Sequence, residues 1–101
     1  MFVAVLVRRL RENVSFEEFK DAWMAAEGHF GRPVRVTHAR RIDDPREIVS
    51  YARMDVSREE LDRWLARTAE SEAERHDRIA TLIEHTVVAG IYEEIDETEL
   101  S

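Results

Sequence analysis

The chain has 101 residues, no cysteine and a formal net charge of −7, and 37% of its residues are charged. This length is that of one domain, the lack of cysteine excludes disulfide bonds and thiol chemistry, and the negative charge argues against binding nucleic acid through a basic surface. The apolar run at residues 2–7 is too short to span a bilayer and lacks the basic flank of a signal peptide, so we expect no membrane association and a soluble, cytoplasmic protein.

Three Ser-x-x-Glu sequences predict the starts of helices, at Ser15–Glu18, Ser57–Glu60 and Ser71–Glu74. In such a capping box the serine hydroxyl accepts a hydrogen bond from an amide of the first turn, and the glutamate reaches back to the amide of the serine. The three boxes divide the chain into strand, helix, strand, strand, helix, helix and strand.

The first strand is predicted at residues 2–9, where both faces are apolar, as in a central strand that is covered on two sides. A helix follows over about 16–27, and Gly28 suits a left-handed stop before a loop at 29–33. The apolar stripe of this helix has three- and four-residue spacing and comprises Phe16, Phe19, Trp23 and Ala26.

The middle of the chain predicts a hairpin of two strands, at 34–42 and 47–55, joined by a turn at Asp43-Asp44-Pro45. A short helix is expected after Ser57 and a longer one after Ser71. The last strand is predicted at about 85–95, which completes a single domain over 1–95, and residues 96–101 form an acidic tail.

The order βαββαβ is that of the split-βαβ, ferredoxin-like fold, an α+β fold with a four-stranded antiparallel sheet and helices on one face. The first and last strands are nevertheless apolar on both faces. A bare apolar face would exceed the patch that a monomer usually exposes. We therefore expect a symmetric homodimer whose sheets face each other and form a barrel.

Four segments resemble the dimeric α/β-barrel superfamily, which includes antibiotic-biosynthesis monooxygenases, EthD-like proteins and stress-responsive barrel proteins. They are Phe2-Val3-Ala4-Val5-Leu6-Val7-Arg8, Ser15-Phe16-Glu17-Glu18-Phe19-Lys20-Asp21-Ala22-Trp23, Arg41-Ile42-Asp43-Asp44-Pro45 and Ser57-Arg58-Glu59-Glu60-Leu61. Two branch features differ. Asp55 stands near the place where the monooxygenases often have tryptophan, and His29-Phe30-Gly31-Arg32-Pro33 interrupts the His-Gly-Pro of the EthD-like branch.

The resemblance implies a pocket between the sheet and its helices or inside the barrel. It also implies oxygenation of electron-rich aromatic molecules without metal or flavin, so no cofactor is expected. Such a site needs aromatic walls, a proton acceptor and a cation that holds a phenolate.

His38 and His76 are the candidate proton acceptors, because histidine titrates near neutral pH. The alternative for each is a partly buried histidine that is bonded to a backbone carbonyl. The Glu72–His76 pair is also consistent with an ordinary helical contact.

Six further residues are candidates for substrate binding: Trp23, Arg40, Tyr51, Arg53, Trp64 and Tyr92. The arginines could hold an anion, or form surface ion pairs. The tyrosines could line the pocket, or pack at the dimer interface with their hydroxyls at its rim. The tryptophans fit core packing as well as a pocket wall.

Other chemistries lack their motifs. The four histidines show no His-x-His, His-x-x-x-His or His-Glu-x-x-His spacing, so no metal site is predicted. No Gly-x-Ser-x-Gly sequence and no glycine-rich phosphate loop occur.

Two functions remain open. One is a cofactor-independent monooxygenase or isomerase acting on a hydrophobic, aromatic small molecule. The other is a non-catalytic dimeric barrel that binds a ligand or serves in stress tolerance. A cavity of roughly 300 Å³ or more that contains His38 or His76 together with an arginine favours the enzyme, whereas a barrel filled by Val, Ile and Met favours the second.

Overall fold

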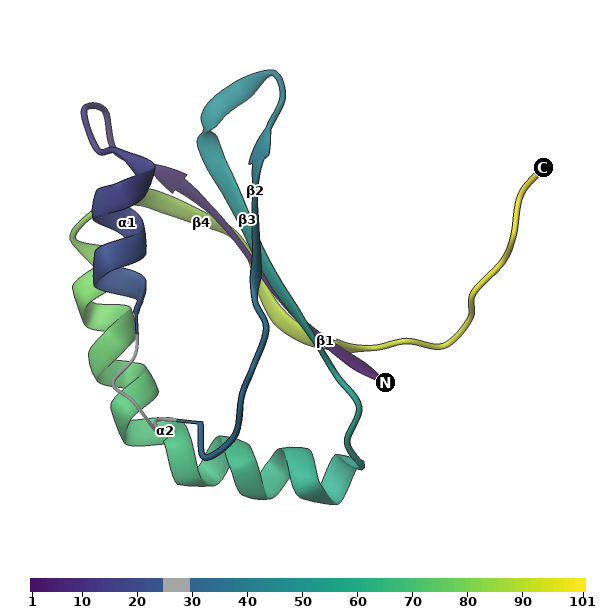
Figure 1. Ribbon diagram of the computed structural model, residues 1–101. Coiled ribbons are helices and arrows are strands. Elements are labelled where there is room, and N and C mark those ends of the chain that lie inside the picture. The colour runs from purple at the N-terminus through teal and green to yellow at the C-terminus, as the bar shows by residue number, and fades with distance from the viewer. Residues whose placement is uncertain (25–29) are drawn as a thin grey trace.

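The computed structural model describes residues 1–24 and 30–101 and has an α+β architecture (Figure 1). Its elements in chain order are β1 (Phe2–Leu10), α1 (Phe16–Trp23), β2 (Thr37–Arg41), β3 (Asp44–Met54), α2 (Arg58–Ala80) and β4 (Ile83–Glu93). No helix in the described part of the chain is long and apolar enough to cross a membrane.

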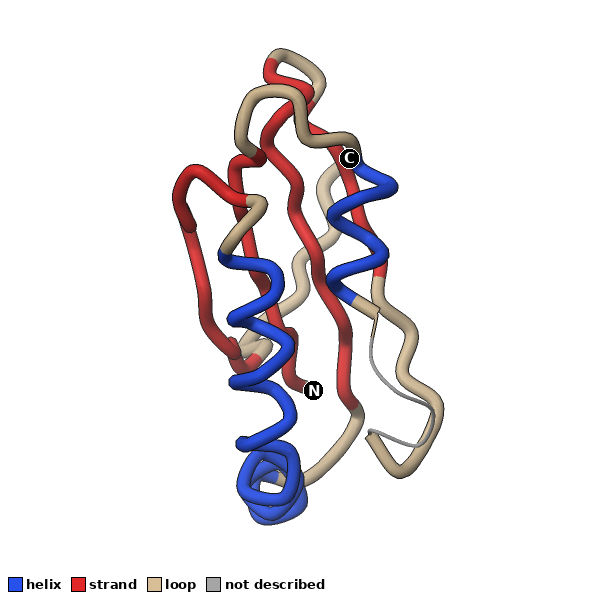
Figure 2. Tube along the Cα trace, turned by 90° about the vertical axis from the view of Figure 1, so that its left-hand side faces the viewer, coloured by secondary structure: helices blue, strands red, loops and turns tan. Residues whose placement is uncertain are grey.

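The four strands form one antiparallel sheet in the order β2-β3-β1-β4. This order and the βαββαβ succession confirm the predicted ferredoxin-like fold. Both helices lie in front of the same face of the sheet in Figure 2. The predicted arrangement of one covered face is therefore correct.

Cross-strand pairing assigns each side chain of β1 to one of the two faces. Ala4 pairs with Ala52 and Leu6 with Ser50, and these residues face the helices. Val5 lies between Tyr51 and Gly90, on the face opposite α1 and α2, which neither of these helices covers. The uncovered face carries the side chains of Val3, Val5, Val7, Val49, Tyr51, Val88 and Tyr92, and we call it the bare face.

Two separate apolar clusters hold the helices on the sheet. The first contains Phe19, Leu10, Ile48 and Ile79, and it joins α1 and the end of α2 to the sheet. The second contains Phe2, Met54 and Leu61, and it fixes the start of α2. A cavity lies between the helix layer and the sheet, in the space between these two clusters.

Helix α1 begins as its sequence predicts. Ser15 accepts a hydrogen bond from the amide of Glu18, and the Glu18 carboxylate accepts one from the amide of Ser15. The helix ends at Trp23. The predicted stripe residue Ala26, the stop at Gly28 and the start of the loop at His29 lie outside the described residues.

Helix α2 corrects the prediction of two helices after Ser57 and Ser71. It is one helix of 23 residues, capped by Ser57 and Glu60, and Ser71 lies in its interior. The Ser71 hydroxyl donates to the carbonyl of Thr68 at 3.2 Å, and the Thr68 hydroxyl donates to the carbonyl of Trp64 at 3.0 Å. Hydroxyls that bond back to helix carbonyls often bend a helix, and α2 bends midway (Figure 1).

A single helix predicts different effects of replacing Ser57 at its cap and Ser71 in its interior. Ser57→Ala should lower the free energy of unfolding by about 1 kcal/mol, because it removes a helix cap. Ser71→Ala should change it by less than about 0.5 kcal/mol, because alanine is the best helix former and no cap is lost there. Urea unfolding of both variants measures this, and equal losses would contradict the single helix.

The hairpin turn lies earlier in the chain than predicted, and β3 starts at Asp44 and not at residue 47. The chain turns at residues 42–43, Arg41 pairs with Asp44, and Pro45 lies inside β3 and not in the turn. Strand β2 starts at Thr37 and not at residue 34, and β4 covers Ile83–Glu93 and not 85–95. Residues 94–101 leave the sheet without regular secondary structure (Figure 1).

Candidate functional site

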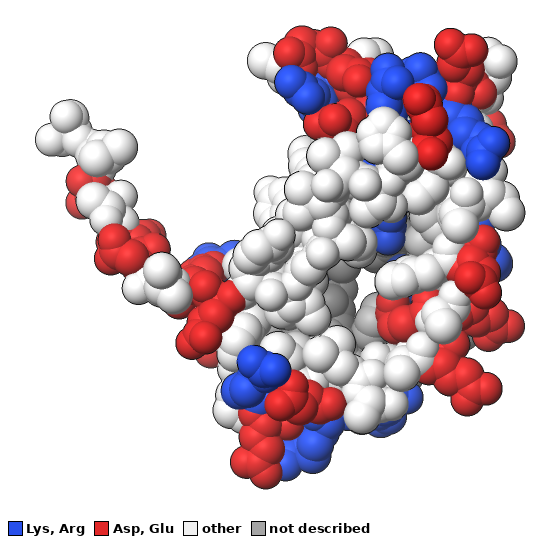
Figure 3. Space-filling view, turned by 180° about the vertical axis from the view of Figure 1, so that it is seen from behind, with Lys and Arg blue, Asp and Glu red and all other residues white. Residues whose placement is uncertain are grey.

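A cavity of about 380 Å³ lies between the helix-facing side of the sheet and the concave side of α2. The hollow opens in a largely uncharged part of the surface (Figure 3). Its lining is mainly apolar and aromatic and includes Leu6, Trp23, Phe30, Ser50, Trp64 and Ile91. Helix α2 contacts the sheet through Leu61 near its start and Ile79 near its end, and the residues of α2 that line the cavity lie between these two anchors.

One end of the cavity carries three charged or titratable side chains of α2: Glu72, Arg75 and His76. Their spacing of three and four residues places them on one helix face. The Glu72 carboxylate accepts from Arg75 Nη2 at 2.9 Å and lies 3.3 Å from His76 Nε2. Apolar walls with a few convergent polar groups at one end are typical of a small-molecule site.

His76 keeps a proton-accepting form near neutral pH. Burial lowers the pKa of this histidine, and the charges of Arg8 and Arg75 lower it further, while Glu72 acts in the opposite direction. A lowered pKa favours the neutral form of the imidazole. His76 can therefore accept a proton from a bound molecule, and Glu72 would stabilise the imidazolium that forms.

His38 reaches the cavity through Ser50. A hydrogen bond of 2.7 Å links His38 Nδ1 and Ser50 Oγ, and Ser50 lines the cavity. The ring of His38 packs edge-on against Phe16, Phe19 and Trp23. Burial is the main cause that lowers its pKa, with Lys20, Arg8 and Arg75 adding to it. The lowered pKa favours the neutral form of His38, which lies behind the cavity wall at Ser50.

The structure brings four of the eight predicted site residues to the cavity: Trp23, Tyr51, Trp64 and His76. Tyr51 borders it from the sheet, although the register directs the side chain of this residue to the bare face. Three others lie elsewhere. Arg53 makes a bidentate ion pair with Glu94 at 2.9 Å, Arg40 is exposed on β2, and Tyr92 is 52% exposed on the bare face.

Sequence reasoning missed Ser50, Glu72 and Arg75 as parts of this site. The Glu72–His76 spacing was a usable signal, but a helical contact explains it equally well. Ser50 and Arg75 carried no local signal, because their importance depends on contacts with residues far along the chain: His38 for Ser50 and Trp23 for Arg75.

A second pocket of about 430 Å³ lies between the first half of α2 and residues 30–32. It is lined by Phe30, Gly31, Arg32, Val56, Glu60, Arg63, Trp64 and Arg67. Arg67 donates to the carbonyl of Phe30 at 2.8 Å, and Arg63 pairs with Glu59 at 3.0 Å. Gly31 has a φ of +72°, and a Cβ there would come within 2.8 Å of Arg67. The guanidinium groups of Arg63 and Arg67 are both engaged in these contacts, so we place the candidate site in the first cavity.

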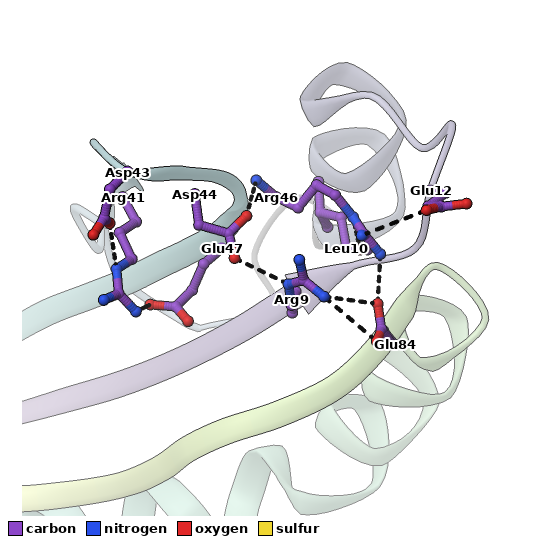
Figure 4. Close-up of polar contacts among 9 residues, drawn as sticks. All are labelled: Arg9, Leu10, Glu12, Arg41, Asp43, Asp44, Arg46, Glu47 and Glu84. Carbon is purple, nitrogen blue, oxygen red and sulfur yellow. Dashed lines mark hydrogen bonds and ion pairs between the residues drawn. The ribbon is translucent and has the colours of Figure 1, made fainter.

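A network of ion pairs at the hairpin end of the sheet is structural. Arg9 donates to Asp44 at 3.0 Å and pairs with Glu84. Arg46 also pairs with Glu84, and it donates to the carbonyl of Leu10 (Figure 4). These contacts tie the hairpin to β1 and β4. Within residues 1–24 and 30–101, no group of three or more acidic or histidine side chains could hold a metal ion.

Comparison with solved structures confirms the suspected resemblance at the level of the fold. A protein from Nitrosomonas europaea, described provisionally as an antibiotic biosynthesis monooxygenase, is 20% identical with a TM-score of 0.61 over 95% of this chain and 100% of that one. A protein from Agrobacterium tumefaciens is 19% identical with a TM-score of 0.58 over the full length of both chains. No protein-family model and no curated protein sequence matches the chain.

Proposed function

We propose that the cavity binds a hydrophobic, aromatic small molecule and that the protein is a cofactor-independent monooxygenase. The observation that carries this proposal is the cavity itself. Its volume of about 380 Å³ exceeds the size that a small aromatic molecule needs, and His76 and Arg75 lie together at one end of apolar walls. The name of the similar protein from Nitrosomonas europaea supports the same reaction class.

The residues have distinct roles in this proposal. Trp23, Phe30 and Trp64 hold the flat rings of the substrate and exclude water. His76 accepts a proton from the substrate, which makes the remaining carbanion or phenolate electron-rich enough to react with molecular oxygen. One oxygen atom enters the substrate and the other leaves as water with the two hydrogens that the substrate loses, so no external reductant is needed.

Oxygen uptake tests the reaction class. With an anthrone or a dihydroxynaphthalene as substrate, we expect uptake by the wild type and a rate at least tenfold lower in His76→Ala, since the proton acceptor is lost. The rate in Ser50→Ala shows whether the hydrogen bond between Ser50 and His38 contributes to the reaction. His85→Ala is the matched control, because His85 is exposed on β4 and does not line the cavity.

Two results separate this proposal from the non-catalytic alternative. If none of the proteins consumes oxygen with either substrate, the monooxygenase proposal is wrong for this substrate class. Calorimetric binding of the same molecules without turnover would then favour a ligand-binding barrel, which shares the cavity but not the chemistry.

We also propose that two copies associate through the bare face. Valine side chains of β1 and the tyrosines Tyr51 and Tyr92 make this face apolar, and Tyr51 and Tyr92 are 39% and 52% exposed in the single chain. Contiguous apolar surface of this kind is typical of a protein interface. Sedimentation equilibrium measures the association directly, and a particle of 11.9 kDa at micromolar concentration would contradict it.

A further inference from the structure

Two arginines are buried close to the charged end of the cavity. Arg75 lines the cavity from α2 and is 5% exposed, and Arg8 comes from the helix-facing side of β1 and is 4% exposed. Arg8 lies over the ring of Phe19 at 5.8 Å, and Arg75 over that of Trp23 at 4.8 Å. A fully buried guanidinium is uncommon, because the charge loses its hydration.

Each guanidinium has a nitrogen without a hydrogen-bond acceptor among the described residues. Arg75 donates through Nη1 to the carbonyl of Trp23 and through Nη2 to Glu72, but its Nε has no such partner. The same holds for Nη1 of Arg8. Since buried N–H groups are nearly always paired, two unpaired donors near one cavity indicate that an acceptor belongs there.

The charges at this end are also unbalanced within the described part of the chain. Glu72 is the carboxylate that acts on both arginines, so two positive charges face one negative charge. The pKa of Arg8 is lowered to about 10, mainly by burial and next by the charge of Arg75, whose effect is larger than the opposite effect of Glu72. A second anion near Arg75 would remove this imbalance.

A carboxylate fits this place better than a phenol. A carboxylic acid is ionised at pH 7, whereas a phenol with a pKa of about 10 is neutral there and brings a donor of its own. A carboxylate offers two acceptor oxygens, which match guanidinium N–H groups in number and geometry.

We propose that the ligand of this cavity is an aromatic carboxylate whose anionic group binds to Arg75, with Arg8 providing a second positive charge behind it. This inference rests on the proposed function, because it concerns the same cavity. It narrows the substrate class from aromatic molecules in general to aromatic acids.

Calorimetry with two probes of nearly equal shape tests the inference. At pH 7, 2-naphthoate should bind the wild type at least tenfold more tightly than the neutral 2-naphthamide. Arg8→Met should reduce this preference at least threefold while the affinity for 2-naphthamide stays the same. Arg58→Gln is the matched control, because Arg58 is exposed at the start of α2 and pairs with Asp62 at 2.9 Å.

The possible failures can be told apart. Equal affinities for acid and amide in the wild type would overturn the aromatic-acid inference and leave the proposed cavity function intact. A preference for the acid that survives both Arg8→Met and Arg75→Met would overturn the assignment to these arginines. If neither probe binds, nor 2-naphthol, both proposals are wrong.

Discussion

Replacing Arg8 with methionine is expected to raise the free energy of unfolding of the ligand-free protein by about 2 kcal/mol. The guanidinium is buried, one of its nitrogens has no acceptor among the described residues, and its pKa is lowered to about 10. A shift of this size corresponds to about 3 kcal/mol by which burial, and next the charge of Arg75, disfavour the charged form of Arg8. Methionine fills similar space without a charge, and such replacements are often stabilising, although the contact with Phe19 is lost.

Replacing Arg75 with methionine should instead lower the free energy of unfolding. Arg75 donates to Trp23 and pairs with Glu72, so Arg75→Met leaves a carbonyl and a partly buried carboxylate with fewer donors. Breaking one side of a buried pair usually costs about 3 kcal/mol or more. Urea unfolding of the two variants gives both values, and a large loss in Arg8→Met would contradict our interpretation of Arg8.

The pH dependence of Arg8 follows from the direction of its shift. Because the folded pKa of Arg8 is lower than the unfolded one, the unfolded chain binds more protons from about pH 10 up to the ordinary pKa of arginine. Stability from this group therefore rises with pH in that interval. Below about pH 10 Arg8 is fully charged in both states, and its unfavourable contribution to the free energy of unfolding no longer changes with pH. The increase in this free energy in Arg8→Met should therefore be constant across the neutral range.

The second large effect is expected at the bare face. Val5 lies at its centre, between Tyr51 of β3 and Gly90 of β4. In the proposed dimer, Val5→Asp would bring a carboxylate from each copy into an apolar contact without a partner, which costs several kcal/mol. The dimer dissociation constant should therefore rise at least 100-fold, as measured by sedimentation equilibrium.

Ala66→Asp is the matched control, since Ala66 is exposed on α2 and lines neither pocket. The control should leave the dissociation constant unchanged, and both variants should keep the circular dichroism spectrum of the wild type. Equal dissociation of Val5→Asp and wild-type dimers would place the contact on a different surface.

Local patterns predicted the fold well wherever local chemistry decides it. The Ser15 and Ser57 boxes cap helices because the amides that follow them have no other acceptor. The Ser71 box failed because residues 66–70 continue the helix, so the amides after Ser71 already bond to carbonyls one turn back. A four-residue pattern is the same in both settings, and only the preceding residues distinguish them.

The site was predictable only in part for a different reason. His76 and the two tryptophans stand on apolar helix stripes that must face the sheet, so their position follows from periodicity. Arg53 and Arg40 looked equivalent to Arg75 in the sequence, yet Arg53 pairs with Glu94 and Arg75 is buried against Trp23. Those partners lie 41 and 52 residues away, and no short-range pattern specifies them.

The bend in α2 separates the helix into two segments that contribute different side chains to the cavity. The segment before the bend carries Trp64 and Leu65 along the open side of the cavity, and the segment after it carries Glu72, Arg75 and His76. Each segment is anchored by its own apolar cluster, the first through Leu61 and the second through Ile79. Substitutions in the segment before the bend can therefore change the shape of the cavity and its ligand selectivity, while Glu72, Arg75 and His76 keep their positions in the segment after it.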